Sequence, residues 1–422
     1  MEILSSYNLI IEASVIIILS FIFGELSRKT NIPSVLMLIV LGIVLKFGMD
    51  AMGIGGIDFF PILEVLGIVG LIMIVLEAAL ELELKKEKYM AIAKAMGIAL
   101  IGLMVSTYIA ALILYQFIPN MSMEQAWLYA TPLSILSSAI IIPSVVGLQE
   151  RKKEFHIYES TFSDIMGIML FYFLTAQMDA PADHSNGLVG FGANVLVTIA
   201  LSLVASYLIV FIFQHIKSHT KLFLLIAVLL LLYSIGKLMH LSSLIIILIF
   251  GLLIANMKLF FRGKLGEWLH LEKASHIYEG LHVITMETAF VVRTFFFVIF
   301  GITISLASLA NINVAIVSLL IILSIYVIRF VILRLFMGKD IIPQLFVAPR
   351  GLITILLFYA IPESAAVEGF EPGILLFIII GTSMIMTAAM VYDKKRSGQA
   401  IKKAKEVSVG MERWKAPAIN ER

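Results

Sequence analysis

Long apolar stretches follow one another along almost the whole chain, most of them about as long as the ~17–25 residues with which a helix crosses the hydrocarbon core of a membrane. In lipid, only helices and closed barrels satisfy all backbone hydrogen bonds, and continuous apolar runs lack the alternating pattern of a barrel. Charged residues make up 14% of the chain and the mean hydropathy is +1.02, which is too apolar for a soluble surface. We therefore predict an all-α polytopic membrane protein.

Thirteen segments can be marked as transmembrane helices. They cover roughly residues 8–27, 34–49, 60–82, 91–117, 126–148, 157–178, 187–213, 221–236, 240–257, 281–307, 312–337, 343–361 and 372–392. We expect residues 1–392 to form one integral membrane domain, followed by a short basic tail at 393–422 at the membrane surface. The start of the chain lacks the features of a signal peptide, so we expect the first segment to be retained.

Positive charges fall in alternate loops. On one side lie Arg28, Lys29, Lys85, Lys86, Lys88, Lys94, Arg151, Lys152, Lys153, Lys217, Lys221, Lys258, Arg262, Lys264, Lys273, Lys339 and the tail from Lys394. The loops at 118–125, 179–186, 308–311 and 362–371 carry none, and only Lys46 and Lys237 sit near that side. Because loops rich in lysine and arginine face the cytoplasm, we expect the N-terminus outside and the C-terminus cytoplasmic.

An internal repeat is legible in the sequence. Residues 32–43 (IPSVLMLIVLGI), after Arg28, resemble residues 241–252 (LSSLIIILIFGL), after Lys237. The first copy begins on the cytoplasmic side and the second begins outside. This favours inverted six-helix repeats at about 8–178 and 221–392, joined by a linking helix at about 187–213, which is the plan of many secondary transporters.

Helix-breaking residues occupy matching places in the two halves. The fifth segment of the first half contains Pro132 and Pro143, and the fifth segment of the second half contains Pro343, Pro349 and Gly351. Proline removes a backbone donor and frees a carbonyl, which at membrane depth is tolerated only beside protein, water or an ion. Prolines that merely kink packed helices are the alternative. The matched placement favours two broken helices at an ion site.

Asp164 is the central candidate residue. An ionisable group inside a membrane helix costs several kcal/mol and marks a functional site by default. Glu159 lies about one turn inside the same helix, and Asp164 lies roughly 7 Å deeper on a different helix face. Arg329 is expected at the depth of Glu159. We therefore predict a structural ion pair between Glu159 and Arg329 that leaves Asp164 unpaired, with snorkelling of Arg329 toward the cytoplasm as the alternative.

A buried, unpaired carboxylate suggests a mechanism. Burial disfavours the charged form of the group, so Asp164 can hold a proton or release it and bind a monovalent cation, but not both. Combined with alternating access, this exclusion is cation:proton exchange. Neutral oxygens would complete the cation shell, and the candidates are Ser163, Ser134, Ser137, Ser138 and carbonyls freed at the break. Each serine alone is as well explained as a helix-packing residue.

Two further intramembrane charges receive structural roles. Glu77 lies near a cytoplasmic helix end, where helix packing or the electrostatics of a cytoplasmic funnel is favoured over ion binding. Arg293 precedes the phenylalanine-rich run at 295–297 and is expected to support the core.

The chain resembles the monovalent cation:proton antiporters, the superfamily of bacterial and animal sodium/proton exchangers. The run ESTFSD at 159–164 resembles their Glu-Ser-x-x-Asn-Asp signature, and residues 28–36 look like their first cytoplasmic turn. Residues 295–301 (FFFVIFG) are similar to their Phe-Phe-x-x-x-Gly helix, and residues 349–351 (PRG) to their Arg-Gly helix. These matches occur in order along nearly the whole chain.

The resemblance implies a core domain with two crossed, unwound helices beside an oligomerising domain, an elevator-type motion and a homodimer. By the same pattern Asp164 binds the ion, Glu159 pairs with Arg329, and Arg350 helps to hold the broken helices; on its own, Arg350 could equally be an anchor at a helix start. The transported ions are the only expected small-molecule partners besides the lipid bilayer. We expect no cofactor and no nucleic acid.

Two departures from the pattern bear on the transported ions. The asparagine before the aspartate is Ser163 here, and the Thr-Asp-Pro of the broken helix is replaced by 137–139 (SSA), closer to the potassium-efflux branch. Sodium, potassium and lithium therefore all stay open. Electrogenic members carry two adjacent aspartates and usually a membrane lysine, whereas this chain has one aspartate and no matching lysine. One titrating carboxylate predicts electroneutral 1:1 exchange.

Other classes of protein are less consistent with the sequence. An intramembrane enzyme is disfavoured because the chain has no Gly-x-Ser-x-Gly elbow and no His-Glu-x-x-His helix. The absence of cysteine excludes disulfides and cysteine nucleophiles. A potassium-efflux-type channel or exchanger, and a non-transporting sensor on a transporter fold, remain the alternatives.

Overall fold

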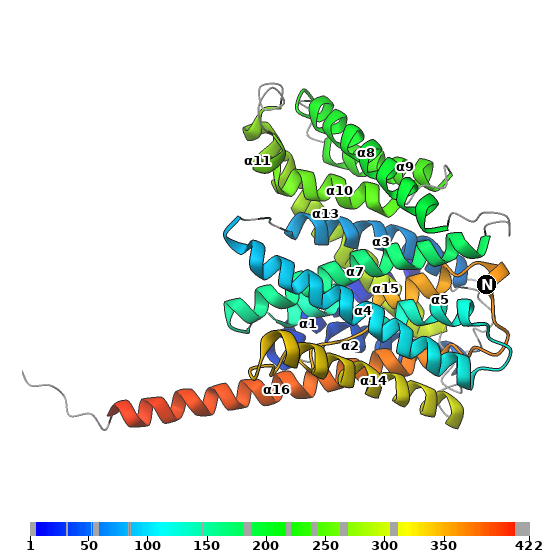
Figure 1. Ribbon diagram of the computed structural model, residues 1–422, viewed down its shortest axis with the longest axis vertical. Helices are drawn as coiled ribbons and strands as arrows, with labels where there is room; N and C mark the ends of the chain where they lie inside the picture. The colour runs from blue at the N-terminus through cyan, green and yellow to red at the C-terminus, as the bar shows by residue number, and fades with distance from the viewer. Residues whose placement is uncertain are drawn as a thin grey trace, which may run out of the picture.

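The computed structural model is a bundle of helices that run roughly side by side (Figure 1). It describes residues 6–30, 33–51, 53, 59–82, 84, 86–145, 147–179, 187–216, 221–238, 243–261, 269–303 and 311–409. Within these ranges every regular element is helical, and ten helices are long and apolar enough to cross a membrane. The predicted all-α membrane fold is confirmed, whereas the number of thirteen crossings stays a prediction.

The first half of the chain supplies the helices α1 (Ser6–Thr30), α2 (Ser34–Ala51), α3 (Phe60–Glu81), α4 (Tyr89–Phe117), α5 (Met123–Ser134), α6 (Ser138–Ser144) and α7 (Glu150–Asp179), with the short 3₁₀ turn η1 (Lys86–Lys88). The second half supplies α8 (Gly187–Phe213), α9 (Lys221–Leu238), α10 (Ser243–Ala255), α11 (Met257–Phe260), α13 (Leu271–Thr303), α14 (Ile312–Met337), α15 (Leu352–Tyr359) and α16 (Gly373–Val409), with the 3₁₀ turn η3 (Glu363–Ala365).

The segment expected at 126–148 is divided into two helices. A capping box formed by Ser122 and Gln125 starts α5, and Pro132 lies in its last turn. Ile135 and Ser137 then have extended backbone conformations before α6 begins. The break predicted from the prolines is present, and it lies just after Pro132.

The segment expected at 343–361 is more irregular than a broken helix. Its first part is a series of turns, residues 347–351 have no regular secondary structure, and only α15 is helical. This corrects the prediction of a helix from 343. Pro343 and Pro349 have no N–H to donate, so two helical hydrogen bonds are missing within a few residues.

Three helices extend well beyond their apolar segments. α7 begins at Glu150 instead of 157, α13 begins at Leu271 instead of 281, and α16 continues to Val409 instead of stopping at 392. The added residues are rich in lysine and glutamate, which are good helix formers in water. Residues 393–409 are therefore a helical continuation of α16, and α16 projects beyond the bundle in Figure 1. Residues 410–422 lie outside the described ranges.

The helices pack as two groups. The first helix group contains α1, α2, α3, α8, α9, α10, α11 and α13, and the second helix group contains α4, α5, α6, α7, α14, α15 and α16. Packing is extensive within each group. Between the groups, α3 contacts α7 and α15, and α1 contacts α6. The two breaks therefore both lie in the second helix group.

The two glycines of the sequence repeat are packed in related ways. Gly42 of α2 lies so close to α13 that an added Cβ would collide with the carbonyl of Val298 and lie 2.9 Å from the Cα of Gly301. An added Cβ on Gly251 of α10 would lie 2.6 Å from the Cβ of Ala79 on α3. In the predicted repeat, α2 corresponds to α10 and α3 corresponds to α13. The contact of α2 with α13 and the contact of α10 with α3 are therefore equivalent, as an inverted repeat would give.

Candidate functional site

The two broken segments cross and exchange backbone hydrogen bonds. The N–H of Ser137, in the first break, donates to the carbonyl of Pro349 in the second break over 3.0 Å. In a continuous helix this N–H would donate to the carbonyl of Leu133. That carbonyl instead accepts from Nε of Arg350 at 2.8 Å. Two backbone groups that the first break leaves without a helical partner, the N–H of Ser137 and the carbonyl of Leu133, are thus satisfied from the second break.

Arg350 is held from three directions at this crossing. Its side chain is 2% exposed, and besides Leu133 it donates from Nη1 to the carbonyl of Ala348 at 3.3 Å. Its backbone N–H donates to Oγ1 of Thr382 on α16 at 3.1 Å. Arg350 therefore contacts both broken segments, through the carbonyls of Leu133 and Ala348, and its role in holding the broken helices stays a prediction.

Asp164 lies in the middle of α7 and is 3% exposed. Among the described residues, neither of its carboxylate oxygens has a hydrogen-bond partner of ordinary geometry. The hydroxyl and the backbone N–H of Ser138, at the start of α6, face the carboxylate. A buried carboxylate without a partner is costly, so a proton or a cation is needed to neutralise it.

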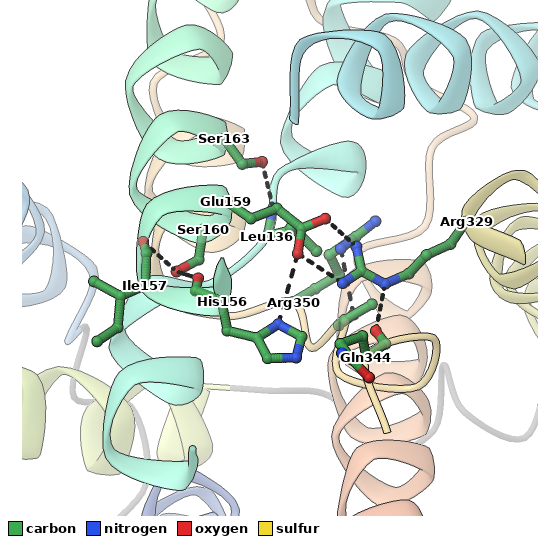
Figure 2. A network of polar contacts seen from close by, with 10 residues as sticks. Leu136, His156, Ile157, Glu159, Ser160, Ser163, Arg329, Gln344 and Arg350 are labelled. Atoms are coloured by element: carbon green, nitrogen blue, oxygen red, sulfur yellow. Dashed lines mark hydrogen bonds and ion pairs between the residues drawn. The ribbon is translucent and has the colours of Figure 1, made fainter. Parts of the chain in front are cut away.

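Glu159, by contrast, is fully paired (Figure 2). Arg329 donates from Nη1 to Oε1 at 2.7 Å and from Nη2 to Oε2 at 2.8 Å. The guanidinium also donates from Nε to the carbonyl of Gln344 at 2.9 Å. This bidentate geometry is the strong form of a carboxylate–arginine pair. The predicted contact is therefore present, and snorkelling of Arg329 is not what the structure has.

The four candidate serines do not all gather round Asp164. Ser138 faces Asp164, and Ser137 is occupied at the crossing through its backbone N–H. Ser134 and Ser163 instead line a cavity with Glu159, Arg329, Arg350 and Ser106, and Asp164 is not among its lining residues. The cavity has a volume of about 30 Å³, where one water needs roughly 10–15 Å³ on the same scale.

The hydroxyls of these two cavity serines are already engaged. Ser134 donates to the carbonyl of Ala130 at 2.9 Å. Ser163 accepts from the backbone N–H of Leu136, within the first break, at 3.0 Å. Both have lone pairs left for a water or a cation. These contacts, however, lie within α5 and at the first break, and not at Asp164.

Arg293 and Glu77 are joined across the first helix group. Nη2 of Arg293 lies 3.1 Å from Oε2 of Glu77, and Nη1 donates to the carbonyl of Ala139 on α6 at 3.3 Å. Glu77 thus has a specific partner, which the sequence did not indicate. Arg293 contacts the broken helix as well as its own group.

Sequence reasoning missed two other members of the site. Gln344 supplies the carbonyl that accepts from Arg329, but a backbone role carries no sequence signal. His156 is fully buried, and its Nδ1 lies 3.6 Å from Oε2 of Glu159. Its spacing of three residues from Glu159 on one helix was a signal that could have found it.

An all-helical membrane bundle with two crossing breaks and a buried unpartnered carboxylate is the construction of a secondary active transporter. The family model described as "Sodium/hydrogen exchanger, transmembrane" matches residues 15–391. The chain therefore belongs to the sodium/hydrogen exchanger family, within the monovalent cation:proton antiporter superfamily. It is a transporter and not an enzyme, and the transported ions are its substrates. None of the curated proteins compared with the chain matches it.

Solved structures give the same fold. The chain is similar to the sodium proton antiporter MjNhaP1 from Methanocaldococcus jannaschii at pH 8, with a TM-score of 0.65, 21% identity, and coverage of 92% of this chain and 97% of that one. A map of the same antiporter by electron microscopy gives a TM-score of 0.64 and 19% identity, covering 98% and 100% of the two chains. At this level of identity the likeness shows the fold alone.

Proposed function

We propose that the protein exchanges Na⁺, or in its place K⁺ or Li⁺, for H⁺ at Asp164. The observation that carries the proposal is the contrast between two buried carboxylates on one helix. Glu159 is neutralised by Arg329, whereas among the described residues no basic side chain pairs with Asp164 and neither of its oxygens has a hydrogen bond of ordinary geometry. Of these two carboxylates, Asp164 is the one left to take a proton or a cation. Ser138 is the first candidate for a neutral oxygen ligand because it faces the carboxylate.

One exchanging carboxylate makes the cycle electroneutral. A cation that replaces one proton leaves the charge of the site unchanged, so each cycle carries one positive charge in each direction. Arg329 and Arg350 hold structural contacts in this scheme and take no part in the exchange. The proposed stoichiometry is 1:1.

The division into two helix groups supports an elevator-type motion. Asp164 and both breaks belong to the second helix group, and packing between the groups is thinner than packing within them. The second group can therefore move as a unit against the first. One cross-group contact is Nζ of Lys237 on α9, which lies 4.8 Å from the ring centre of Tyr172 on α7.

We further propose a homodimer in a bacterial or archaeal cytoplasmic membrane, with the N-terminus outside and the C-terminus inside. The charge distribution of the loops supports this orientation. In Figure 1 the start of the chain and the projecting end of α16 lie at opposite ends of the helices, in keeping with it. A channel of the potassium-efflux type or a sensor is the alternative function.

The test is cation:proton exchange in proteoliposomes. Wild-type protein should dissipate an imposed proton gradient when Na⁺, K⁺ or Li⁺ is added, and Asp164→Asn should fold but transport nothing. The matched control is Glu154→Gln, which changes a partly buried carboxylate almost three turns nearer the cytoplasmic end of α7, where it pairs with Lys88. Exchange by Asp164→Asn at the wild-type rate would remove Asp164 from the mechanism, and a cation conductance without proton exchange would favour the channel.

A further inference from the structure

Arg293 is the polar link between the first helix group and the helix that faces the ion site. It belongs to α13, and its Nη1 donates to the carbonyl of Ala139 in α6 over 3.3 Å. Apart from this side chain, α13 and α6 pack little against each other. The second guanidinium nitrogen, Nη2, lies 3.1 Å from Glu77 of α3. The arginine is thus fixed to the first group on one side and reaches the second group on the other.

The bonded carbonyl is one that the sequence leaves without a helical partner. In a regular helix the carbonyl of Ala139 accepts from the N–H four residues later. That residue is Pro143, which has no N–H. A carbonyl at membrane depth, even a half-buried one such as that of Ala139, needs another donor. Arg293 supplies that donor.

Ala139 is next to the residue that faces the carboxylate. Ser138, whose hydroxyl and N–H face Asp164, precedes it directly in the first turn of α6. A shift of the Ala139 peptide therefore moves Ser138 relative to Asp164. The first turn of a seven-residue helix that contains a proline has few bonds of its own to resist such a shift.

We propose that Arg293 is a positioning residue for the ion site: it replaces the hydrogen bond that Pro143 removes from Ala139, and so holds Ser138 in place opposite Asp164. Glu77 orients the guanidinium and balances its charge. The hydrogen bond to Ala139 is therefore supplied without adding a net positive charge near the cation site. This inference rests on the proposed exchange at Asp164.

The test is the apparent KM for Na⁺ in proteoliposomes, with cation-induced thermal stabilisation in detergent as a second measure of affinity. Arg293→Met should raise the apparent KM about tenfold, equivalent to about 1.4 kcal/mol, and leave the maximal rate per folded protein within about twofold. A role in stability alone would lower the amount of folded protein without moving KM. The control is Arg334→Met, which removes an exposed arginine that donates to the carbonyl of Gly338.

A double-mutant cycle tests the link to the proline. Pro143→Ala restores the N–H four residues after Ala139, so the effect of Arg293→Met on KM should be at least about threefold smaller in the Pro143→Ala background. Equal effects in the two backgrounds would overturn the proposal, as would an unchanged KM in Arg293→Met. If Arg293→Met does not fold, Arg293→Lys replaces it, with a rise in KM of at least about threefold expected and an unchanged KM contradicting the proposal.

Failure of this inference is distinct from failure of the proposed function. If wild-type protein exchanges Na⁺ for H⁺ and Asp164→Asn does not, while the Arg293 variants keep the wild-type KM, only the positioning role is lost. If Asp164→Asn transports like wild type, the proposed site itself is wrong.

Discussion

The N–H of Ser137 donates to the carbonyl of Pro349 over 3.0 Å, although 212 positions, 349 minus 137, separate the two residues in the chain. This bond joins the two breaks at their crossing point. With the bond from Arg350 to Leu133, it removes the cost of interrupting two helices inside a membrane. The crossing therefore supplies an unwound segment near Asp164 in which these two backbone groups are satisfied.

The pair formed by Glu159 and Arg329 should matter for stability. Glu159→Gln leaves a buried guanidinium without its carboxylate, so we expect a loss of about 3–5 kcal/mol in the free energy of unfolding. The measurement is thermal unfolding in detergent. The double variant Glu159→Gln with Arg329→Gln should lose less than the sum of the single variants; strict additivity would argue against a coupled pair.

Close helix packing between α2 and α13 should tolerate no side chain at Gly301. An added Cβ would lie 3.0 Å from the Cα of Gly42 and would collide with the carbonyl of Ile39. We expect Gly301→Ala to cost about 1–3 kcal/mol. Gly97→Ala on α4, where nothing lies within 4 Å of the added Cβ, is the control and should gain roughly 0.5–1 kcal/mol. Unfolding in detergent compares the two, and equal stabilities would contradict the tight packing.

Relative motion of the two helix groups can be tested by cross-linking, because the chain contains no cysteine. Cysteines at Lys237 and Tyr172, on α9 and α7, joined by a short bifunctional reagent, should stop transport. The control pair replaces Tyr207 and Phe261, which lie within the first group with ring centres 6.2 Å apart, and should leave transport intact. Continued exchange after complete linking of the first pair would exclude a sliding motion.

Electroneutral exchange predicts insensitivity to voltage. With a proton gradient imposed, a change in membrane potential of 100 mV alters the driving force by about 2.3 kcal/mol for each net charge moved. For 1:1 exchange no net charge moves, so we expect initial rates within about twofold at any clamped potential. Acceleration of inward proton transport by an inside-negative potential would indicate that more than one proton enters for each cation that leaves.

Apolar segment length and proline positions predicted much of the fold, because both act locally along the chain. Membrane helices are specified by local apolar length, and breaks by local proline, so the interruptions near Pro132 and Pro349 could be read from the chain. The contact between Glu159 and Arg329 was accessible because depth in a membrane can be counted along each helix.

Other features depend on relations that the chain does not encode locally. Each residue rotates a helix by about 100°, and the sequence does not give the rotation of one helix relative to the next. It therefore could not show that Ser163 lines the cavity with Glu159 while Ser138 faces Asp164. The long polar extension of α16 has no apolar signal. The bond from Arg293 to Ala139 joins a side chain to a backbone carbonyl, and a carbonyl is the same in every residue.

The most direct measurement is proton release on cation binding by purified protein, followed by calorimetry in two buffers of different ionisation enthalpy. If H⁺ and Na⁺ compete for Asp164, each bound Na⁺ should release close to one proton where the site is mostly protonated, and in that range the apparent Kd should rise about tenfold for each unit fall in pH. Asp164→Asn should show neither binding nor release. Cation binding that releases no proton, or that persists in Asp164→Asn, would contradict the account.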